Sequence, residues 1–247
     1  MSHKNDHHFS QFRKFFRILP LEIHFTDFTT TMVQILSENF SIVNSWINEL
    51  RNIETQKNRA IFRRNMERIG EIAAFEISKY LETVDVEITT PLDKIWVKEI
   101  AVQPVITTIL RAGVPLFQGI LNYLDKADCG FVAAYRKHDD NDYFSIKQDY
   151  LTCPNITERP LIVADPMLAT GASLIEAIKD LLNHGTPSQM HIVAAIASKQ
   201  GVETIAKEYP NAKIWVGAID EQLTSKGYIT PGLGDAGDLS YGEKLQR

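Results

Sequence analysis

Residues 165–173 read Asp165-Pro166-Met167-Leu168-Ala169-Thr170-Gly171-Ala172-Ser173. The stretch directly follows the apolar run 161–164 and precedes a helical pattern, so we expect a strand, a tight turn and a helix N-terminus to meet here. The first turn of a helix carries backbone N–H groups without internal partners and the positive end of the helix dipole, and small residues let an anion approach both. The pattern therefore predicts a phosphate-binding turn.

The same turn carries polar side chains that suit a sugar. Thr170 and Ser173 supply hydroxyl donors, and the ionised carboxylate of Asp165 accepts hydrogen bonds such as those from ribose hydroxyls. A P-loop is excluded, because its pattern needs a lysine and none lies between Asp165 and Ile178. We expect a sugar phosphate, with an ordinary strand-to-helix turn capped by serine as the alternative.

Composition and charge narrow the function classes. The chain has 247 residues, 44% of them apolar, which is enough for one substantial core. A net charge of −5 and a pI of about 5.8 argue against nucleic acid as a partner. Two cysteines without metal-ligand or disulfide spacing indicate a reducing cytoplasm. No apolar stretch approaches the ~18 to 20 residues of a membrane helix, so no membrane partner is expected.

Hydrophobic periodicity predicts an α/β protein. Apolar residues recur at helical spacing over residues 31–53 and 57–81, which indicates core-facing helices. After Pro104, short apolar runs alternate with helical stretches, and such runs are typical of a parallel sheet with both faces covered; they span residues 105–110, 130–135, 161–164, 191–197 and 214–219. Between Arg136 and Pro160, apolar and polar residues alternate, which predicts an antiparallel arm. Residues 1–8 are typical of a solvated tail.

Four segments resemble one family. The turn at residues 165–173 resembles the phosphoribosyl-pyrophosphate (PRPP) motif of the type I phosphoribosyltransferase family, in the form of the uracil phosphoribosyltransferases. Residues 109–113 resemble the family's pyrophosphate loop, residues 134–136 its second arginine segment and residues 227–238 its uracil loop, in the family's order. The resemblance covers roughly residues 50–242.

The resemblance implies a type I phosphoribosyltransferase fold, in which a parallel sheet is flanked by helices and a C-terminal hood covers the active site. We divide the chain into an N-terminal extension, residues 1–45, consisting of a tail and a helix, and a phosphoribosyltransferase domain, residues 46–247. The implied reaction is transfer of the 5-phosphoribosyl group of PRPP to N1 of uracil, forming UMP and pyrophosphate in pyrimidine salvage. A homodimer is expected.

Two arginines are candidates for binding pyrophosphate. Arg111 follows the run 105–110, and its forked, permanently charged guanidinium suits a leaving group that gathers negative charge; a surface ion pair is the alternative. Arg136 is predicted to follow the next strand in the same way and to contact the pyrophosphate or the 5-phosphate side. The complete PRPP-binding set that we predict is Arg111, Arg136, Asp165, Pro166, Met167, Leu168, Ala169, Thr170, Gly171, Ala172, Ser173 and Asp235.

The C-terminal run is dense in glycine, at positions 227, 232, 234, 237 and 242. Such a loop can present its own N–H and C=O groups to a flat ligand with amide edges, and uracil is such a ligand. An N–H group aimed at O4 would reject cytosine at a cost of ~1 to 3 kcal/mol per unpaired contact. The resemblance implies uracil contacts by Ile229, Gly234, Asp235 and Ala236. A glycine-rich surface tail is the alternative.

Catalysis is expected to need no protein nucleophile. The resemblance implies Arg111 and Asp235 as catalytic residues and Mg²⁺ as cofactor, held mainly through substrate and water; Asp235 is the candidate residue near the metal or near N1 of uracil. Gln222 and Thr224 stand where glycine and asparagine are common in the family, which weakens the expected support of the uracil pocket. Two alternatives on the same fold are a pyrimidine-responsive regulatory RNA-binding protein and a non-catalytic nucleotide sensor.

Overall fold

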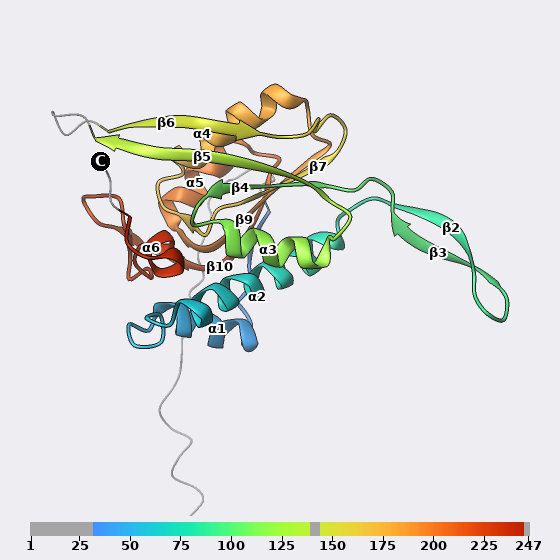
Figure 1. Cartoon of the computed structure of the whole chain (residues 1–247), viewed down its shortest axis with the longest axis horizontal. Helices are drawn as coiled ribbons and strands as arrows, with labels where there is room; N and C mark the ends of the chain where they lie inside the picture. Colours follow the sequence, from blue (N-terminus) through green and yellow to red (C-terminus); the bar gives the residue numbers. More distant parts are fainter. Residues whose placement is uncertain (1–31, 139–143, 245–247) are drawn as a thin grey trace, which may run out of the picture.

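The computed structural model describes residues 32–138 and 144–244, which fold around an eight-stranded sheet (Figure 1). The strands lie in the order β1 (Val33–Ile35), β10 (Lys213–Asp220), β9 (Gln189–Ser198), β7 (Pro160–Ala164), β4 (Val105–Leu110), β5 (Asp128–His138) and β6 (Phe144–Thr152), with β8 (Met167–Leu168) beside β9. All neighbours are parallel except β5 and β6. The five predicted strands and the antiparallel arm are confirmed.

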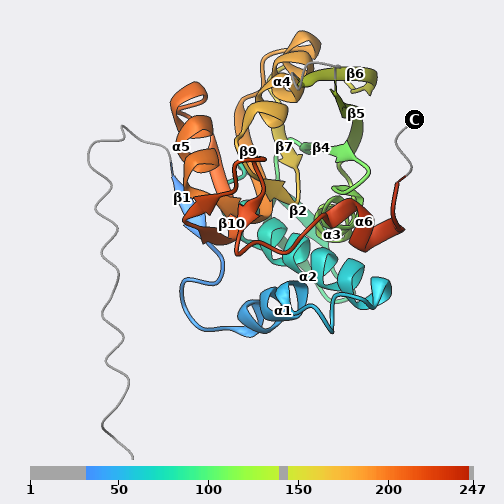
Figure 2. The ribbon, with the colours of Figure 1, turned by 90° about the vertical axis from the view of Figure 1, so that its left-hand side faces the viewer.

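Helices cover both faces of this sheet (Figure 2). One face carries α1 (Ile42–Arg51), α2 (Arg59–Ser78) and α3 (Val114–Tyr123), and the other carries α4 (Ala172–Leu181), followed by the 3-10 turn η1 (Leu182–His184), and α5 (Lys199–Glu208). Strand residues alternate between two cores: Ile106 and Trp215 pack with the first group of helices, Val105 and Ile214 with the second. Apolar residues are needed on both sides of each strand, which explains the continuous apolar runs.

The C-terminal segment lies at the carboxyl ends of the strands. It forms the small hairpin β11 (Gln222–Leu223) and β12 (Ile229–Thr230) and then α6 (Ala236–Tyr241), which packs against α2. In Figure 1, α6 lies at the end of the sheet toward which the arrowheads of β4 and β5 point. Ligands of open α/β sheets bind at this end. Among the helices of the described residues, none is long and apolar enough to cross a membrane.

The N-terminal region differs from the prediction of one helix over residues 31–53. Val33–Ile35 is strand β1, parallel to β10, and α1 begins only at Ile42. Ser41 fixes that start, since its side chain accepts the N–H of Val43 while the Asn44 side chain accepts the N–H of Ser41. The sheet thus includes residues that precede the predicted domain division at residue 45. That division falls inside α1 and remains a prediction. The expected tail lies outside the described residues.

A hairpin that the sequence analysis missed projects from the body, at the right of Figure 1. It consists of β2 (Thr83–Thr89) and β3 (Lys94–Ile100), which pair antiparallel. Apolar Val84, Val86 and Ile88 alternate with charged Asp85 and Glu87, so a period-two signal was present in the sequence.

The position of Arg136 also differs from the prediction. We expected it just beyond a strand over residues 130–135, but β5 continues to His138 and places Arg136 inside the strand, opposite Ile146 of β6. The prediction was wrong because the antiparallel partner extends the ladder beyond the parallel sheet. The Arg136 side chain and residues 139–143 lie outside the described part of the chain.

Candidate active site

The phosphate turn, residues 165–173, has the predicted strand-turn-helix form. Asp165 follows β7 and its N–H donates to the carbonyl of Val193 in the neighbouring strand at 3.0 Å. Gly171, with φ 84°, is the N-cap of α4, which begins at Ala172. The Ala172 N–H donates to the Thr170 hydroxyl at 3.4 Å. The turn therefore points the first N–H groups of α4 toward the carboxyl ends of the strands, where an anion would be bound.

Two residues that sequence reasoning missed hold this turn from behind. The hydroxyl of Ser198, at the end of β9, donates to the carbonyl of Ala169 and accepts the N–H of Gly201 at 2.9 Å. A Cβ on Gly201 would lie 2.4 Å from the Ala169 oxygen, so α5 can approach the turn only without a side chain there. A serine after an apolar run and before a helix is an N-cap signal, which could have identified Ser198.

Arg111 begins beside the phosphate turn, as predicted. It directly follows β4, which pairs with β7, the strand that leads into Asp165. The Thr108 hydroxyl donates to the Ala164 carbonyl at 3.0 Å and links the ends of the two strands. The pyrophosphate loop and the phosphate turn therefore start from neighbouring strand ends.

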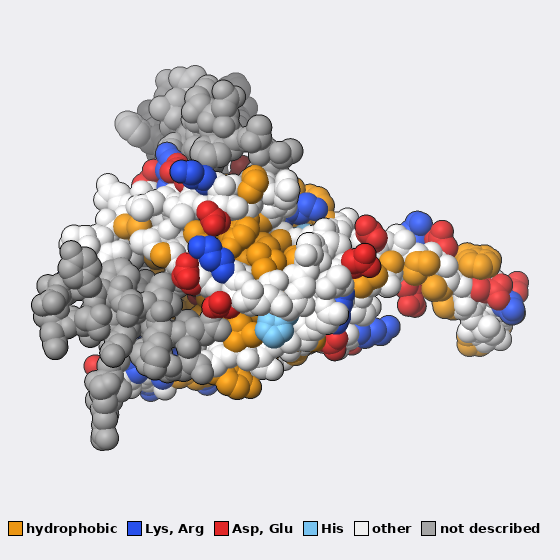
Figure 3. Space-filling view, turned by 90° about the horizontal axis from the view of Figure 1, so that it is seen from above, with side chains coloured by type: hydrophobic (Ala, Val, Ile, Leu, Met, Phe, Trp, Pro, Cys, Tyr) orange, Lys and Arg blue, Asp and Glu red, His pale blue; other side chains and the backbone are white. Residues whose placement is uncertain are grey.

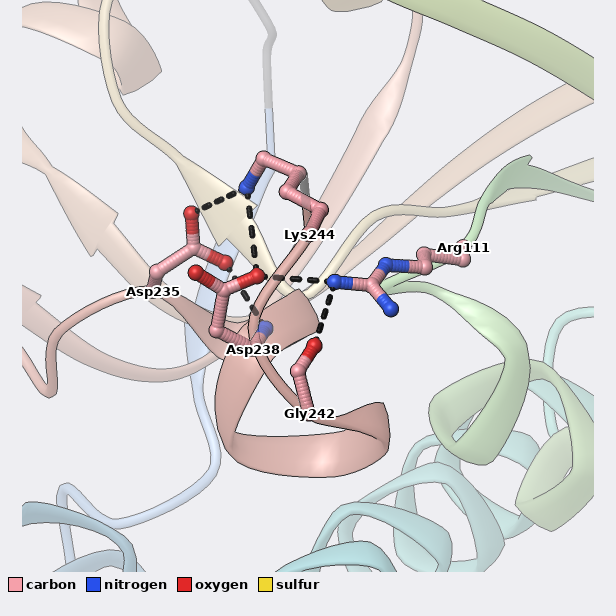
Figure 4. Close-up of polar contacts among 5 residues, drawn as sticks. All are labelled: Arg111, Asp235, Asp238, Gly242 and Lys244. Carbon is pink, nitrogen blue, oxygen red and sulfur yellow. Dashed lines mark hydrogen bonds and ion pairs between the residues drawn. The ribbon is translucent and has the colours of Figure 1, made fainter. Parts of the chain in front are cut away.

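A charged network joins Arg111 to the C-terminal segment (Figure 4). Arg111 Nη2 donates to Asp238 Oδ1 at 2.8 Å and to the Gly242 carbonyl at 2.6 Å. Lys244 Nζ donates to Asp235 Oδ2 at 2.7 Å and lies 3.4 Å from Asp238 Oδ1, while the Asp238 N–H donates to Asp235 Oδ1 at 3.0 Å. The structure thus brings Arg111 and Asp235 into one network and adds Asp238 and Lys244, which the motif analysis did not select.

The network keeps Asp235 ionised. Burial by itself would raise the pKa of Asp235, but the hydrogen bonds from Lys244 and from the Asp238 N–H, with the charge of Lys244, outweigh it and lower that pKa below its ordinary value. The hydrogen bond to Asp235 raises the pKa of Lys244. At neutral pH, Asp235 is therefore a carboxylate paired with an ammonium group.

Three apolar side chains of the glycine-rich segment anchor it to the core. Ile229, Leu233 and Ala236 are 5%, 3% and 2% exposed, whereas Gly234 is exposed with φ 95° and Tyr228 is 53% exposed. Between these anchors, the loop offers backbone groups around Gly234 to a ligand. A Cβ on Gly227 would lie 3.8 Å from Thr170 Cγ2, so the loop also reaches the phosphate turn.

Gln222 and Thr224, which differ from the residues common in the family, have local roles in the small hairpin. The Thr224 hydroxyl accepts the Tyr228 N–H at 3.1 Å and so closes the hairpin turn. Gln222 is exposed and pairs with Thr230 in the β-ladder.

No cluster of metal ligands is present within residues 32–138 and 144–244. No three His, Cys, Asp or Glu side chains there lie close enough together to hold an ion.

The chain is similar to known proteins in both sequence and structure. A family model described as uracil phosphoribosyltransferase matches residues 37–242. A uracil phosphoribosyltransferase of Porphyromonas gingivalis is 46% identical over 211 residues, covering 85% of this chain and 98% of its own, and one of Methanococcus vannielii is 38% identical, covering 81% and 86%. Among solved structures, the AQ2163 protein of Aquifex aeolicus matches with a TM-score of 0.77 at 27% identity, covering 87% of this chain and 100% of that protein.

Proposed function

The chain belongs to the uracil phosphoribosyltransferase family, and we propose that it transfers the 5-phosphoribosyl group of PRPP to N1 of uracil, forming UMP and pyrophosphate in pyrimidine salvage. One observation carries the proposal: the phosphate turn, Arg111 and the glycine-rich loop meet at one end of the sheet. These three parts match the three parts of the reaction, which are a sugar phosphate, a pyrophosphate and a base.

In this proposal the phosphate turn binds PRPP through its 5-phosphate and its ribose. The N–H groups at the start of α4 and the hydroxyls of Thr170 and Ser173 hold the phosphate. Asp165, at the end of β7, accepts hydrogen bonds from the ribose hydroxyls. The buried hydrogen bonds of Ser198 support this role because they fix the backbone of the turn before the substrate arrives.

Arg111 binds the leaving pyrophosphate, with Arg136 as the second proposed contact. Arg111 is 38% exposed and is ion-paired with Asp238, so an incoming pyrophosphate meets a guanidinium already placed at the strand ends. The pyrophosphate competes with Asp238 for it. Because charge on the leaving oxygen grows as the bond breaks, this contact is stronger in the transition state than in the ground state.

The loop reads uracil through backbone groups near Ile229, Gly234 and Ala236. The buried side chains on its inner side support this role, since they leave the exposed backbone at Gly234 as the surface that faces a ligand. An N–H group directed at O4 would discriminate against cytosine, whose amino group cannot accept a hydrogen bond.

The reaction forms a bond between N1 of uracil and C1 of ribose and breaks the bond between C1 and the pyrophosphate oxygen, while the N1 proton passes to solvent. Positioning and charge stabilisation supply the catalysis. Mg²⁺, when bound to pyrophosphate, neutralises charge on the leaving group. The ionised Asp235 carboxylate fits as its one protein oxygen ligand, and its lowered pKa favours this role over taking the N1 proton.

We also propose a homodimer assembled through the projecting hairpin. On one face of it Val86 lies opposite Val97 and Ile88 opposite Ile95, with Val84 beside them opposite Glu99, and orange side chains line this arm at the right of Figure 3. An isolated two-stranded hairpin is marginally stable in water, so this apolar face favours a second copy as its partner. Sedimentation should give a dimer for the native chain and a monomer for an Ile88→Asp, Ile95→Asp variant.

Two further expectations stay predictions. Cys129 and Cys153 are free thiols, which supports a reducing cytoplasm. The net charge of −5 counts against the regulatory RNA-binding alternative.

One assay tests the proposed function. Pyrophosphate release from PRPP is measured with uracil, cytosine, orotate, hypoxanthine and adenine in parallel, with and without Mg²⁺. We expect turnover with uracil alone, dependent on Mg²⁺. Turnover with another base, or none with uracil, would contradict the proposal, and the latter would favour the non-catalytic nucleotide sensor.

A further inference from the structure

A buried ion pair lies directly behind the glycine-rich loop, away from the network of Figure 4. Arg51, the last residue of α1, donates from Nη1 and Nη2 to the two carboxylate oxygens of Asp220 at 2.8 and 2.7 Å. Asp220 is the last residue of β10 and is 7% exposed. Two parallel hydrogen bonds of this kind fix the direction of both side chains as well as their distance.

The same pair holds both backbone polar groups of one loop residue. The Gly232 carbonyl accepts from Arg51 Nη1 at 3.0 Å, and the Gly232 N–H donates to Asp220 Oδ2 at 2.9 Å. Gly232 has φ 58°, and a Cβ there would lie 2.2 Å from the carbonyl oxygen of Ile229, so the chain turns sharply at this point. Gly234 and Asp235 follow this turn by two and three residues.

We propose that Arg51 and Asp220 are positioning residues for uracil, which set the place and direction of the backbone at Gly234 without touching either substrate. This inference rests on the proposed function of the loop. The apolar anchors Ile229 and Leu233 fix the depth of the loop, but apolar contacts are not directional. The ion pair supplies the direction, because its hydrogen bonds constrain the peptide groups on both sides of Gly232.

A matched control exists at the opposite end of the sheet. Arg159 pairs with Asp128 at 2.7 Å and donates to the carbonyls of Gln103 and Pro104, and its side chain is 22% exposed, the same fraction as that of Arg51. Arg159→Met therefore removes an arginine brace from the amino ends of β4, β5 and β7, although its partner Asp128 is 59% exposed whereas Asp220 is 7% exposed. Thermal melts of both variants separate a general loss of stability from an effect on uracil.

The test compares Arg51→Met, Arg51→Lys and Asp220→Asn with Arg159→Met. We expect the KM for uracil to rise about tenfold or more in Arg51→Met and Asp220→Asn, with the KM for PRPP within about twofold of the native value. Arg51→Lys keeps the positive charge but lacks the forked guanidinium, so its KM for uracil should lie between those of the native chain and Arg51→Met. Arg159→Met should leave both KM values unchanged.

A second readout does not depend on activity. Hydrogen exchange of amides in residues 228–236 should be faster by about tenfold in Asp220→Asn than in the native chain, since the Gly232 N–H loses its charged acceptor, and unchanged in Arg159→Met. A native uracil KM in folded Arg51→Met, or equal increases in both KM values, would overturn the inference. If the native chain made no UMP, the proposed function would fail, and unchanged exchange in Asp220→Asn would separately refute the brace.

Discussion

The phosphate turn and the glycine-rich loop belong to the same proposed active site but are held by contacts of different range in the chain. In the phosphate turn, Thr170 accepts the N–H of Ala172 two residues on, and the supporting Ser198 is 29 residues from Ala169. The C-terminal segment is tied to much more distant partners, since Arg111 and Asp238 are 127 residues apart and Arg51 and Asp220 are 169 residues apart. One half of the site therefore depends on contacts of shorter sequence separation than the other.

This difference has a functional consequence. The N–H groups at the start of α4 do not need the loop to bind a phosphate, so that half should bind PRPP even when the loop is damaged. The loop depends on α1, on β10 and on the network around Arg111, so changes in α1 and β10 should weaken base recognition without weakening PRPP binding. The predictions below, ordered by the size of the expected effect, test this separation.

Gly234→Val should produce the largest effect. A Cβ at Gly234 would meet only Leu239 Cδ1 at 3.6 Å and Gln56 Oε1 at 3.9 Å, so the variant should fold, but a β-branched residue at φ 95° is strained. Strain and misplacement of the loop together should lower kcat/KM for uracil by more than about 1000-fold. Steady-state kinetics check this, with Gly234→Ala as an intermediate control. Native uracil turnover in the valine variant would show that the base is read elsewhere.

Arg111→Ala should act on the rate. Loss of a charge-assisted contact to the leaving group should cost ~2 to 4 kcal/mol of transition-state stabilisation, or about 30 to 1000-fold in kcat. Uracil binding should change much less. Single-turnover kinetics at saturating substrates measure the effect, and a thermal melt controls for loosening of α6, which loses its ion pair through Asp238. An unchanged turnover number would remove Arg111 from the mechanism.

A change at His191, near the start of β9, should alter stability but neither half of the site. His191 is buried, its Nδ1 accepts from Trp215 Nε1 at 3.2 Å, and its Nε2 faces Gln189 Oε1 at 3.3 Å. Burial, with the charge of Lys213, lowers its pKa to about 3. The unfolded chain takes up this proton near pH 6.5 and the folded chain does not, so stability is full above pH 6.5 and falls as the pH drops toward 3.

The expected loss is about 2 kcal/mol at pH 5, relative to pH 7.5, from the slope of about 1.4 kcal/mol per pH unit below pH 6.5. Urea unfolding gives the free energy of unfolding of the native chain and of His191→Gln at both pH values. The fall in this free energy from pH 7.5 to pH 5 should be larger for the native chain, and the excess is the contribution of His191. Both KM values should stay native at pH 7.5. A pH-independent difference between the two proteins would mean that the pKa of His191 is the same in the folded and unfolded chain, and would contradict the prediction.

Asp165→Asn should give the smallest effect, confined to the phosphate half. Replacing one acceptor oxygen by a donor should raise the KM for PRPP by about tenfold or less, which corresponds to the loss of one hydrogen bond from a charged group. The KM for uracil should hardly move. Initial rates with each substrate varied in turn measure both constants, and equal increases would instead indicate a folding defect, visible by circular dichroism.

The contrast also explains how much the sequence predicted. The strand-turn-helix form of residues 165–173, the place of Arg111 and the apolar strands were predicted correctly, because each depends on residues close together in the chain. The Arg111–Asp238 and Arg51–Asp220 pairs were missed, since residues 127 and 169 positions apart leave no local pattern. Lys244, six and nine residues from its acidic partners, was missed because it lies beyond the motif at residues 227–238. Arg136 was misplaced for a related reason: pairing with β6 decides where β5 ends.

The most direct test of the two-part site is calorimetric titration of Gly234→Val with PRPP and with UMP, beside the native chain. Our account predicts PRPP affinity within about threefold of native, because the turn forms locally, and UMP affinity weakened by about 100-fold or more, because the base is no longer bound. Equal weakening of both ligands would contradict the account, since the phosphate turn would then depend on the loop. Native UMP affinity would contradict it as well, because the base would then be bound without the loop.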